Sequence, residues 1–340
     1  MVLYHPVEGP IKAATRVHSA TRHESGCFST FSWLPWEQWM IKHAKVYEQK
    51  VELKFRRALW EWNLERIWKH NKEAALGKHN FTLGLNHLAD MTADEVNYAL
   101  NRLRPEKPDP VRNVTWKNVS DWNIPQSVDW RQHGLVSSVQ NQGLCGSCWA
   151  FSALGALEGQ MSRHTGLLVQ LSPQNLVDCS VTDGNHGCKG GYVSKAYTYI
   201  IRNQGVDSEH SYPYEHQNGI CRYSVQGKAA HCSDFRMLPS GDERMLASVV
   251  ANVGPVAVAV NAGLLSFHLY KGGIYSDPKC NPNSINHAVL IVGYGTDKGQ
   301  DYWLVKNSWG SSWGESGYIR IARNAKNTCG IASLPLYPTI

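Results

Sequence analysis

Three residues in this chain are best suited to chemistry. One is a cysteine at the start of an apolar helix, and the others are a histidine and an asparagine far downstream. Cys148 lies in the run QGLCGSCW at 142–149, and the pattern that follows predicts a long helix from Ser147 to about Thr165. A helix N-terminus favours negative charge and stabilises a thiolate, so we expect a lowered pKa for Cys148. Such a thiolate is a nucleophile at or below neutral pH.

A thiolate nucleophile needs a partner that holds and returns a proton, and His287 is the best candidate. It stands at the head of an apolar stretch that reads as a strand, and Asn307 follows in the run NSWG. A cysteine and a histidine held as thiolate and imidazolium are the usual solution for activating this side chain. The side-chain oxygen of Asn307 can fix the tautomer of the ring, and Trp309 can cover that hydrogen bond.

Attack of the thiolate on a carbonyl carbon creates an oxyanion, which needs converging donors. The backbone N–H of Cys148 and the side-chain amide of Gln142 are the candidates. The pair Cys145 and Cys148 also fits a redox or zinc motif, but no second CxxC or HxxxH pair completes a metal site. Taken singly, Cys148 would be a structural cysteine and His287 a core histidine. Their combination with Gln142 and Asn307 favours catalysis without a metal or another cofactor.

The elements that must position these residues follow from length and pattern. A chain of 340 residues with 42% hydrophobic content can bury one large or two ordinary cores. Helical patterns dominate up to about residue 230, and β-branched or aromatic runs follow at 255–262, 287–295, 301–309 and 317–324. A helical lobe followed by a sheet lobe is an α+β layout, with a cleft between the lobes.

The N-terminal third has a different pattern. From about Trp33 to Asn71 it reads as one helix without glycine. Periodicity alone favours an ordinary amphipathic helix with surface charges, although six residues share one face. These are Glu52, Arg56, Trp60, Asn63, Ile67 and Asn71.

Three further segments lead to the second unit. Residues 77–90 alternate like a strand, and 92–103 resume a helical pattern. The proline-rich stretch 105–123 reads as an exposed, cleavable linker, so that a second unit begins at Ile124.

Composition excludes some classes of protein. The net charge is +6, and no Lys/Arg cluster is interleaved with aromatics, so nucleic acid is not an expected partner. No apolar run is long enough to span a membrane. The first 32 residues form a poorly defined segment without a clear signal peptide. Nine cysteines, all but Cys27 between 145 and 329, nevertheless indicate an oxidising compartment, as do the sequons at Asn80, Asn113 and Asn118.

Taken together, these motifs resemble the papain family of cysteine peptidases, in the cathepsin L-like subgroup. The resemblance covers about residues 33–340 and is carried by CGSCW (145–149), NHAVLIVGYG (286–295) and KNSWGSSWG (306–314). The face from Glu52 to Asn71 is similar to the interrupted motif of the family's propeptides, with Trp60 where Phe is common. Gly84, Asn86 and Asp90 resemble their second motif, with Leu88 in place of Phe.

The resemblance implies a two-lobed fold, with a helical left lobe and a β-barrel-like right lobe, behind a helical inhibitory propeptide. Residues 33–123 would be the propeptide and linker, and 124–340 the peptidase. The propeptide would cross the cleft in reverse, leave in acid, and be cleaved near Asn123 or Ile124. The family implies an endopeptidase zymogen acting on peptides and proteins, a monomer, cystatin-type inhibitors as partners, and a lysosomal or secreted location. The alternatives are a binding or inhibitory protein, either a catalytically silent homologue or a propeptide-like domain that binds other proteases, and a transglutaminase-like acyl transferase.

The resemblance also implies disulfides and a specificity pocket. Disulfides would join Cys145 to Cys188, Cys179 to Cys221 and Cys280 to Cys329, leaving Cys27 and Cys232 over. Gly190 and Gly191 would let substrate backbone approach the cleft wall. The second specificity pocket would be apolar and most similar to that of cathepsin K, so it would prefer a residue such as Leu. Its lining residues would be Tyr192, Val193, Ala259, Ile285, Ala288 and Leu334.

Overall fold

The computed structural model describes residues 36–104, 106 and 123–340. The segment 1–32, Trp33, Cys27, the sequons at Asn113 and Asn118 and nearly all of the linker lie outside these described residues.

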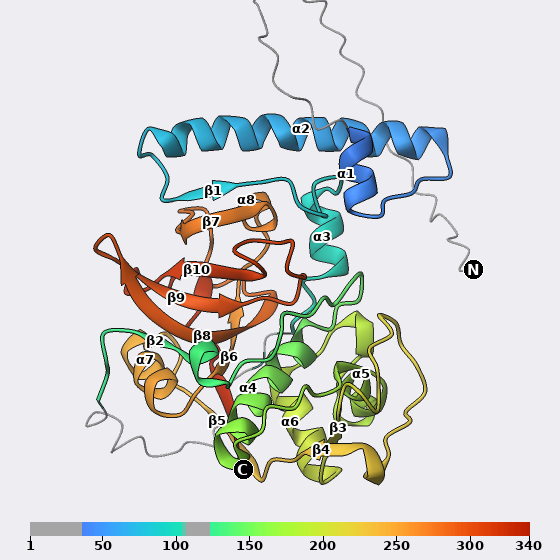
Figure 1. Cartoon of the computed structure of the whole chain (residues 1–340), viewed down its shortest axis with the longest axis vertical. Coiled ribbons are helices and arrows are strands. Elements are labelled where there is room, and N and C mark those ends of the chain that lie inside the picture. Colours follow the sequence, from blue (N-terminus) through green and yellow to red (C-terminus); the bar gives the residue numbers. More distant parts are fainter. Residues whose placement is uncertain (1–35, 105, 107–122) are drawn as a thin grey trace, which may run out of the picture.

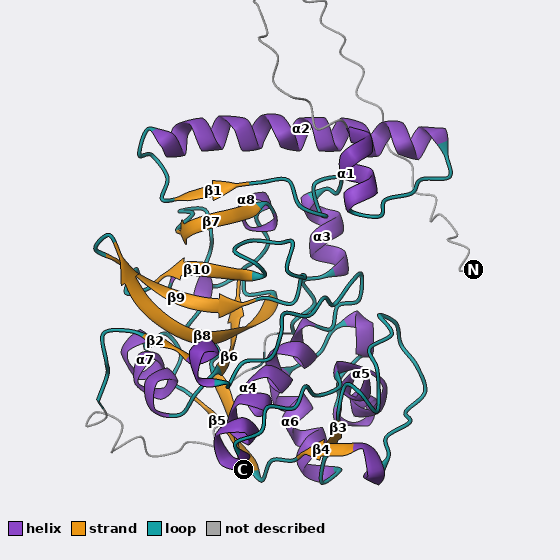
Figure 2. Cartoon of the chain, in the orientation of Figure 1, coloured by secondary structure: helices purple, strands orange, loops and turns teal. Residues whose placement is uncertain are grey.

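Helices and strands are arranged as a two-lobed body with a helical layer across one end (Figures 1 and 2). The helices are α1 (Trp36–Lys42), α2 (Lys50–Ala75), α3 (Ala93–Ala99), α4 (Cys148–Thr165), α5 (Pro173–Cys179), α6 (Val193–Arg202), α7 (Glu243–Asn252) and α8 (Leu265–His268). Short 3-10 turns cover Trp130–His133, Ser180–Asp183, Gly187–Lys189, Val225–Gly227 and Thr328–Gly330. No described helix has the length and apolar character needed to cross a membrane.

The expected single helix from Trp33 to Asn71 is wrong. The chain forms α1 and α2 with a break between them, where Ala44 adopts a left-handed conformation with φ of 49°. The break has a tertiary cause, because the ammonium group of Lys45 and the hydroxyl of Tyr47 both reach the carboxylate of Asp90. Partners far along the chain thereby override local helical preference.

The two segments after α2 are also shorter than expected. Within 77–90 only β1 (Phe81–Leu83) is a strand. Within 92–103 the helix α3 begins at a capping box formed by Thr92 and Glu95 and ends at Ala99. Residues after Leu100 run extended instead, because they lie in the cleft described below.

The sheet lobe contains the strands that the β-branched runs predict. Its order is β1-β7-β10-β9-β8-β6-β11-β5, with β2 paired to β8. The strands are β2 (Val128–Asp129), β5 (Asp234–Met237), β6 (Val256–Val260), β7 (Tyr270–Tyr275), β8 (His287–Asp297), β9 (Gln300–Lys306), β10 (Tyr318–Ala322) and β11 (Leu336–Thr339). Strand β1 extends this sheet from the N-terminal region by pairing antiparallel with β7.

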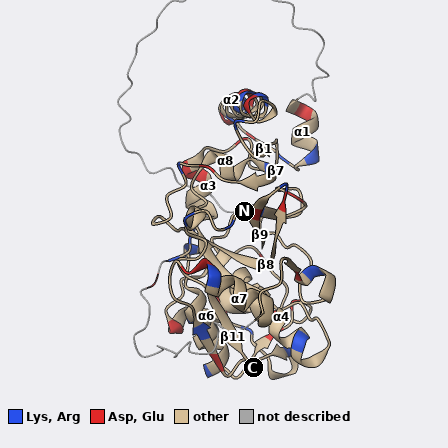
Figure 3. Cartoon of the chain, turned by 90° about the vertical axis from the view of Figure 1, so that its left-hand side faces the viewer, with Lys and Arg blue, Asp and Glu red and all other residues tan. Residues whose placement is uncertain are grey.

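The helical lobe packs around α4, with α5 and α6 beside it and a small sheet of β3 (Val206–Asp207) and β4 (Lys228–Ala230) at its edge. One apolar cluster fills this lobe and includes Trp149 and Tyr197. A second cluster joins the sheet lobe to the N-terminal helices, since it holds Trp39 and Trp60 together with Trp313. Helix α2 lies across the sheet-lobe end and carries both basic and acidic residues (Figure 3).

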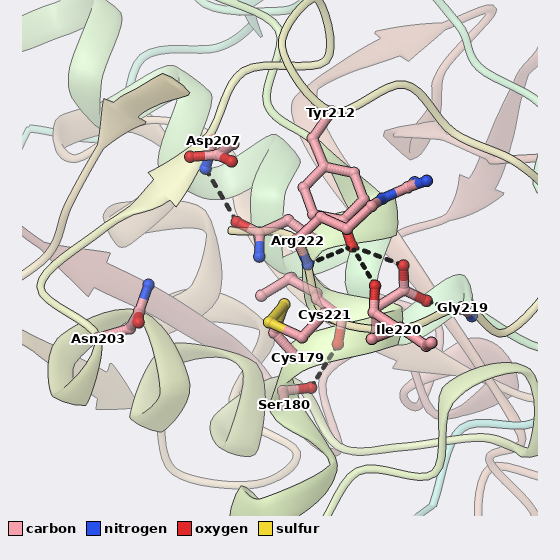
Figure 4. The surroundings of a disulfide bond; sticks show 12 residues. Cys179, Ser180, Asn203, Asp207, Tyr212, Gly219, Ile220, Cys221 and Arg222 are labelled. Atoms are coloured by element: carbon pink, nitrogen blue, oxygen red, sulfur yellow. Dashed lines mark hydrogen bonds between the residues drawn. A yellow bond between two sulfur atoms is a disulfide. The ribbon is translucent and has the colours of Figure 1, made fainter. Parts of the chain in front are cut away.

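The disulfides Cys145–Cys188, Cys179–Cys221 and Cys280–Cys329 are the three pairs that the resemblance implies. Around the second of them, the Tyr212 hydroxyl donates to the carboxylate of Asp178 at 2.7 Å and accepts from the backbone N–H of Arg222 (Figure 4). Cys232 is a buried free thiol, and burial raises its pKa to about 12, so the protonated thiol is favoured at physiological pH.

Candidate active site

Cys148 is the first residue of α4, as its sequence position predicts. Its thiol is completely buried. The expected lowering of its pKa is wrong for this closed state, because burial raises the pKa of Cys148. Hydrogen bonds from the backbone of Ala288 and of Arg102 act in the opposite direction. The thiol therefore lies next to the start of β8 on one side and the N-terminal segment on the other, shielded from water by the latter.

His287 is the first residue of β8 and is also fully buried. Its Nε2–H donates to Oδ1 of Asn307 at 2.8 Å, and that oxygen also accepts from the backbone N–H of Ser308. The ring of Trp309 lies over the imidazole, with 4.8 Å between centroids. Nδ1 has no partner among the described residues, so it is the nitrogen free to exchange a proton. Burial lowers the pKa of His287 to about 4, against the effect of the Asn307 hydrogen bond.

Gln142 presents its amide as a donor, the role that an oxyanion would require. Its Nε2 donates to the backbone oxygens of Cys145, at 2.9 Å, and of Leu100, at 3.1 Å. Its Oε1 accepts from the hydroxyl of Ser308 at 2.6 Å, which fixes the orientation of the amide. The carbonyl oxygen of Leu100, in the N-terminal segment, thus accepts from the same amide that an oxyanion would need as a donor.

The extended segment after α3 lies along the cleft wall. The backbone N–H of Arg104 donates to Gly191, that of Gly191 to Arg102, and that of Leu103 to Asn286. Leu103 and Gly191 form a parallel bridge. Gly190 has a φ of +106°, and a Cβ there would come within 2.3 Å of the carbonyl oxygen of Arg102, so only glycine allows this approach.

The side chain of Leu103 is buried in the helical-lobe apolar cluster. All the expected pocket residues except Tyr192 belong to or pack against this cluster, and Tyr192 is half-buried beside Val193. The cluster members are Val193, Ala259, Ala288 and Leu334, with Ile285 packed against them.

The face of α2 that carries the six spaced residues is not a solvated surface, so the ordinary amphipathic interpretation is wrong. Trp60, Asn63 and Ile67 are buried. The Asn63 amide donates to the Ala89 carbonyl at 2.8 Å, and Asn71 exchanges two hydrogen bonds with the backbone of Leu83.

The charged residues at the start of the same face are also paired. Arg56 contacts Glu95 at 2.8 Å and the more exposed Glu52 at 3.6 Å. The face therefore holds the segment from β1 to α3, with a mixture of apolar packing, amide bonds and ion pairs.

Two residues of the second propeptide-like motif, Gly84 and Asn86, join this segment to the sheet lobe. The backbone N–H of Gly84 donates to Leu269, and the Asn86 amide donates to the His268 carbonyl, each at 2.8 Å. Asp90 instead faces Lys45 within the N-terminal region. Asn80 is exposed, and its side chain contacts Gln300.

Some residues near the site have no local signal in the sequence. His268 is buried with its ring 6.0 Å from that of Trp309, and burial lowers its pKa to about 4. Glu158 and Lys306 are buried charges behind the site. No group of three or more His, Cys, Asp or Glu among the described residues could hold a metal ion.

Comparisons with known families and proteins agree with one another. The family described as papain family cysteine protease matches residues 124–339, and the cathepsin propeptide inhibitor domain (I29) matches residues 36–96. Cathepsin S of Bos taurus is 52% identical over 306 residues, covering 90% of this chain and 92% of the relative. Cathepsin K of Mus musculus is 48% identical over 304 residues, covering 89% and 92%.

Solved structures of precursors are similar over nearly the same span. The digestive procathepsin L 3 of Tenebrio molitor larval midgut has a TM-score of 0.83 at 43% identity, covering 90% of this chain and 98% of that one. A recombinant stem bromelain precursor has a TM-score of 0.78 at 38% identity, covering 89% and 97%. Both similarities include the N-terminal helices as well as the two lobes.

Proposed function

Because the chain belongs to the papain family of cysteine peptidases and carries a cathepsin propeptide inhibitor domain, we propose that Cys148, His287 and Asn307 are its catalytic triad. Residues 33–123 would be the propeptide with its linker, and 124–340 the peptidase. Removal of the propeptide in acid, by cleavage near Asn123 or Ile124, would convert the zymogen to an endopeptidase.

In the proposed mechanism the thiolate of Cys148 attacks the scissile carbonyl carbon, while His287 holds the proton at Nδ1 as imidazolium. The oxyanion accepts from the backbone N–H of Cys148 and the amide of Gln142. The imidazolium then protonates the leaving amine, and the same nitrogen later removes a proton from the water that hydrolyses the thioester. The 2.8 Å bond from His287 to Asn307 supports this assignment, since it leaves only Nδ1 for the proton.

The observation that carries the zymogen proposal is the extended segment over Cys148. Its backbone runs parallel to the wall at Gly191, and its Leu100 carbonyl accepts from the amide of Gln142. A substrate running in the opposite direction would also bond to the backbone of Gly191, and its scissile bond would then lie at the sulfur of Cys148. The reversed direction explains why the propeptide can fill the cleft as an inhibitor in cis without being cleaved there.

The preference for an apolar residue in the second pocket rests on Leu103. Its side chain is buried with Val193, Ala259 and Ala288, and a charge among them would find no partner. We therefore expect substrates with Leu or a similar residue two positions before the scissile bond.

Location and partners follow from the family and the cysteines. The three disulfides fit an oxidising compartment, which supports a lysosomal or secreted protein. Peptides and proteins would be substrates, cystatin-type proteins would be inhibitors, and the enzyme would be a monomer. Exposure of Asn80 is compatible with glycosylation there.

The test is turnover of a fluorogenic peptide with Leu at the pocket position, before and after acid treatment, with and without an epoxide that alkylates catalytic cysteines. We expect activity only after acid treatment, complete loss with the epoxide, and labelling at Cys148. Cys148→Ser should unfold at the same temperature as the wild type yet neither cleave nor label. A folded, acid-processed wild type that neither cleaves nor labels would contradict this function and favour the protease-binding alternative.

A further inference from the structure

Two buried charges that the proposed mechanism does not use lie behind the triad. Glu158 is on α4, the helix that begins with Cys148, and only 2% of it is exposed. Lys306 is the last residue of β9, directly before Asn307, and 8% of it is exposed. One charge therefore lies on the helix that carries Cys148, and the other lies next to Asn307 in the chain.

A serine joins the two charges. The Lys306 ammonium donates to the Ser137 hydroxyl at 2.9 Å, and that hydroxyl donates to the Glu158 carboxylate at 2.6 Å. The other carboxylate oxygen accepts from the backbone N–H of Leu171 at 2.9 Å. Burial raises the pKa of Glu158 and lowers that of Lys306, and each charge opposes the effect on the other. Removing one partner alone would leave an uncompensated buried charge.

A small cavity lies between α4 and the strands at this point, and α4 and β8 touch directly beside it. Its lining includes Ser152 and Glu158 from α4, Val289 from β8, and Lys306 with Asn307 from the end of β9. On the β8 side, the Ser152 hydroxyl donates to the Val289 carbonyl at 2.7 Å. Because side chains leave this space unfilled, the links through Ser137 are the contacts that tie Lys306 to Glu158 at this point.

We propose that Lys306, Ser137 and Glu158 are positioning residues for the triad. They tie β9 to α4 and thereby hold Asn307 in the register at which its Oδ1 orients the imidazole facing Cys148. The proposal rests on the triad assigned above. It gives the buried pair a catalytic consequence, since a displacement of about 1 Å in a reacting group can cost on the order of hundredfold in rate.

The experiment compares acid-processed wild type with the double variant Glu158→Gln/Lys306→Met, with Ser137→Ala, and with Arg222→Gln. The double variant removes both charges, so no buried charge is left unpaired. Arg222 forms an exposed ion pair with Glu215 in the helical lobe and serves as the control. For each protein, kcat, KM, the unfolding temperature and the pH profile of Cys148 alkylation by iodoacetamide are measured.

We expect the double variant and Ser137→Ala to keep KM within about twofold while kcat falls about tenfold or more. Alkylation of Cys148 should need a higher pH, because a misoriented imidazolium stabilises the thiolate less well. Arg222→Gln should match the wild type in all four measurements.

The double variant could keep the wild-type kcat and alkylation profile and differ only in a lower unfolding temperature. Lys306, Ser137 and Glu158 would then have a structural role alone, and the proposal would be overturned. If the double variant does not fold, the kcat and alkylation profile of Ser137→Ala decide between a positioning and a structural role in the same way. Failure of the proposed function looks different, because the wild type itself would then neither cleave nor show selective alkylation.

Discussion

At the scale of single residues, the chemistry depends on which nitrogen of His287 carries a proton at rest. Asn307 accepts from Nε2–H, its oxygen is held by the N–H of Ser308, and the ring of Trp309 keeps water away from this bond. In the proposed mechanism Asn307 therefore acts on the orientation of the imidazole, whereas His287 itself exchanges the proton.

This difference predicts unequal losses of activity. His287→Ala should lower kcat/KM by at least about 10³-fold, because no other group can protonate the leaving amine. Asn307→Ala should lower it by about ten- to hundredfold, mainly through kcat, since the ring remains but is less well oriented. Kinetics of the processed variants measure both effects, with exposed His133→Ala as the control. Equal losses would mean that Asn307 does more than orient the ring.

Residues of the site differ in how far sequence could predict them. Gln142 and Cys148 fall in one short motif, and His287 and Asn307 head or follow recognisable strands, so the sequence alone singles out these four as candidates. The covering residues Leu100 and Arg102 were not, because nothing local indicates that a segment will fold back onto a cleft built from residues much later in the chain. The lowered pKa expected for Cys148 is wrong in the zymogen for the same reason: burial by this segment outweighs the helix N-terminus.

At the scale of elements, α2 works as a clamp on the segment that enters the cleft. Asn63 is completely buried, and its amide donates to the carbonyl of Ala89 between β1 and α3. An alanine at this position would leave that carbonyl without its partner, at a cost of about 1–3 kcal/mol.

Asn63→Ala should therefore open the zymogen more often at neutral pH. The rate of epoxide labelling of Cys148 in the intact zymogen measures this opening, and we expect it to rise by about five- to hundredfold. Glu65→Ala, an exposed position on the same helix, is the matched control and should label at the wild-type rate. Identical rates for both variants would show that this bond does not hold the propeptide closed.

Element boundaries were the least predictable feature. Periodicity correctly gave helices before and after the break between α1 and α2, but the break depends on Asp90, which lies far along the chain. Likewise α3 ends early because the next residues pair with Gly191 in the peptidase. In both places a tertiary contact outweighs a propensity that alone would continue the helix.

At the scale of the whole molecule, propeptide and peptidase share one sheet and one core. Strand β1 adds to β7, and Trp60 belongs to the same apolar cluster as Trp309. The sequence predicted the strands β6, β8, β9 and β10 but not β7, and it did not predict the strand order, because β7 pairs parallel with β10 and antiparallel with β1 across long separations. The proposed release of the propeptide in acid would therefore break part of a common core, which requires a substantial driving force.

We expect a histidine at the junction to be one source of that force. His87 of the propeptide faces Ser312 of the peptidase at 3.5 Å, and its ring lies 6.5 Å from that of His43. Burial, then the charges of Lys45 and His43, lower the pKa of His87 to about 4, while Asp90 acts in the opposite direction. Burial, Lys42 and Lys45 also lower the pKa of His43.

The sign of the effect follows from these directions. A histidine whose pKa is lower when docked than when free must be neutral to stay docked. Docking is therefore strongest above the free value near 6.5 and weakens as pH falls towards 4. This window coincides with the acid conditions that the proposed activation requires.

Replacing His87 by a side chain that cannot ionise should delay activation. His87→Gln keeps a donor for Ser312 but takes up no proton, so we expect the midpoint of zymogen activation to move to lower pH by about half a unit or more. His43 still titrates in this variant, so acid activation should persist. The measurement is the fraction of processed enzyme after a fixed time across a pH series, with exposed His133→Gln as the control. If His87→Gln and the wild type share one midpoint, protonation of His87 does not drive release, and the acid response must come from other groups at the shared core.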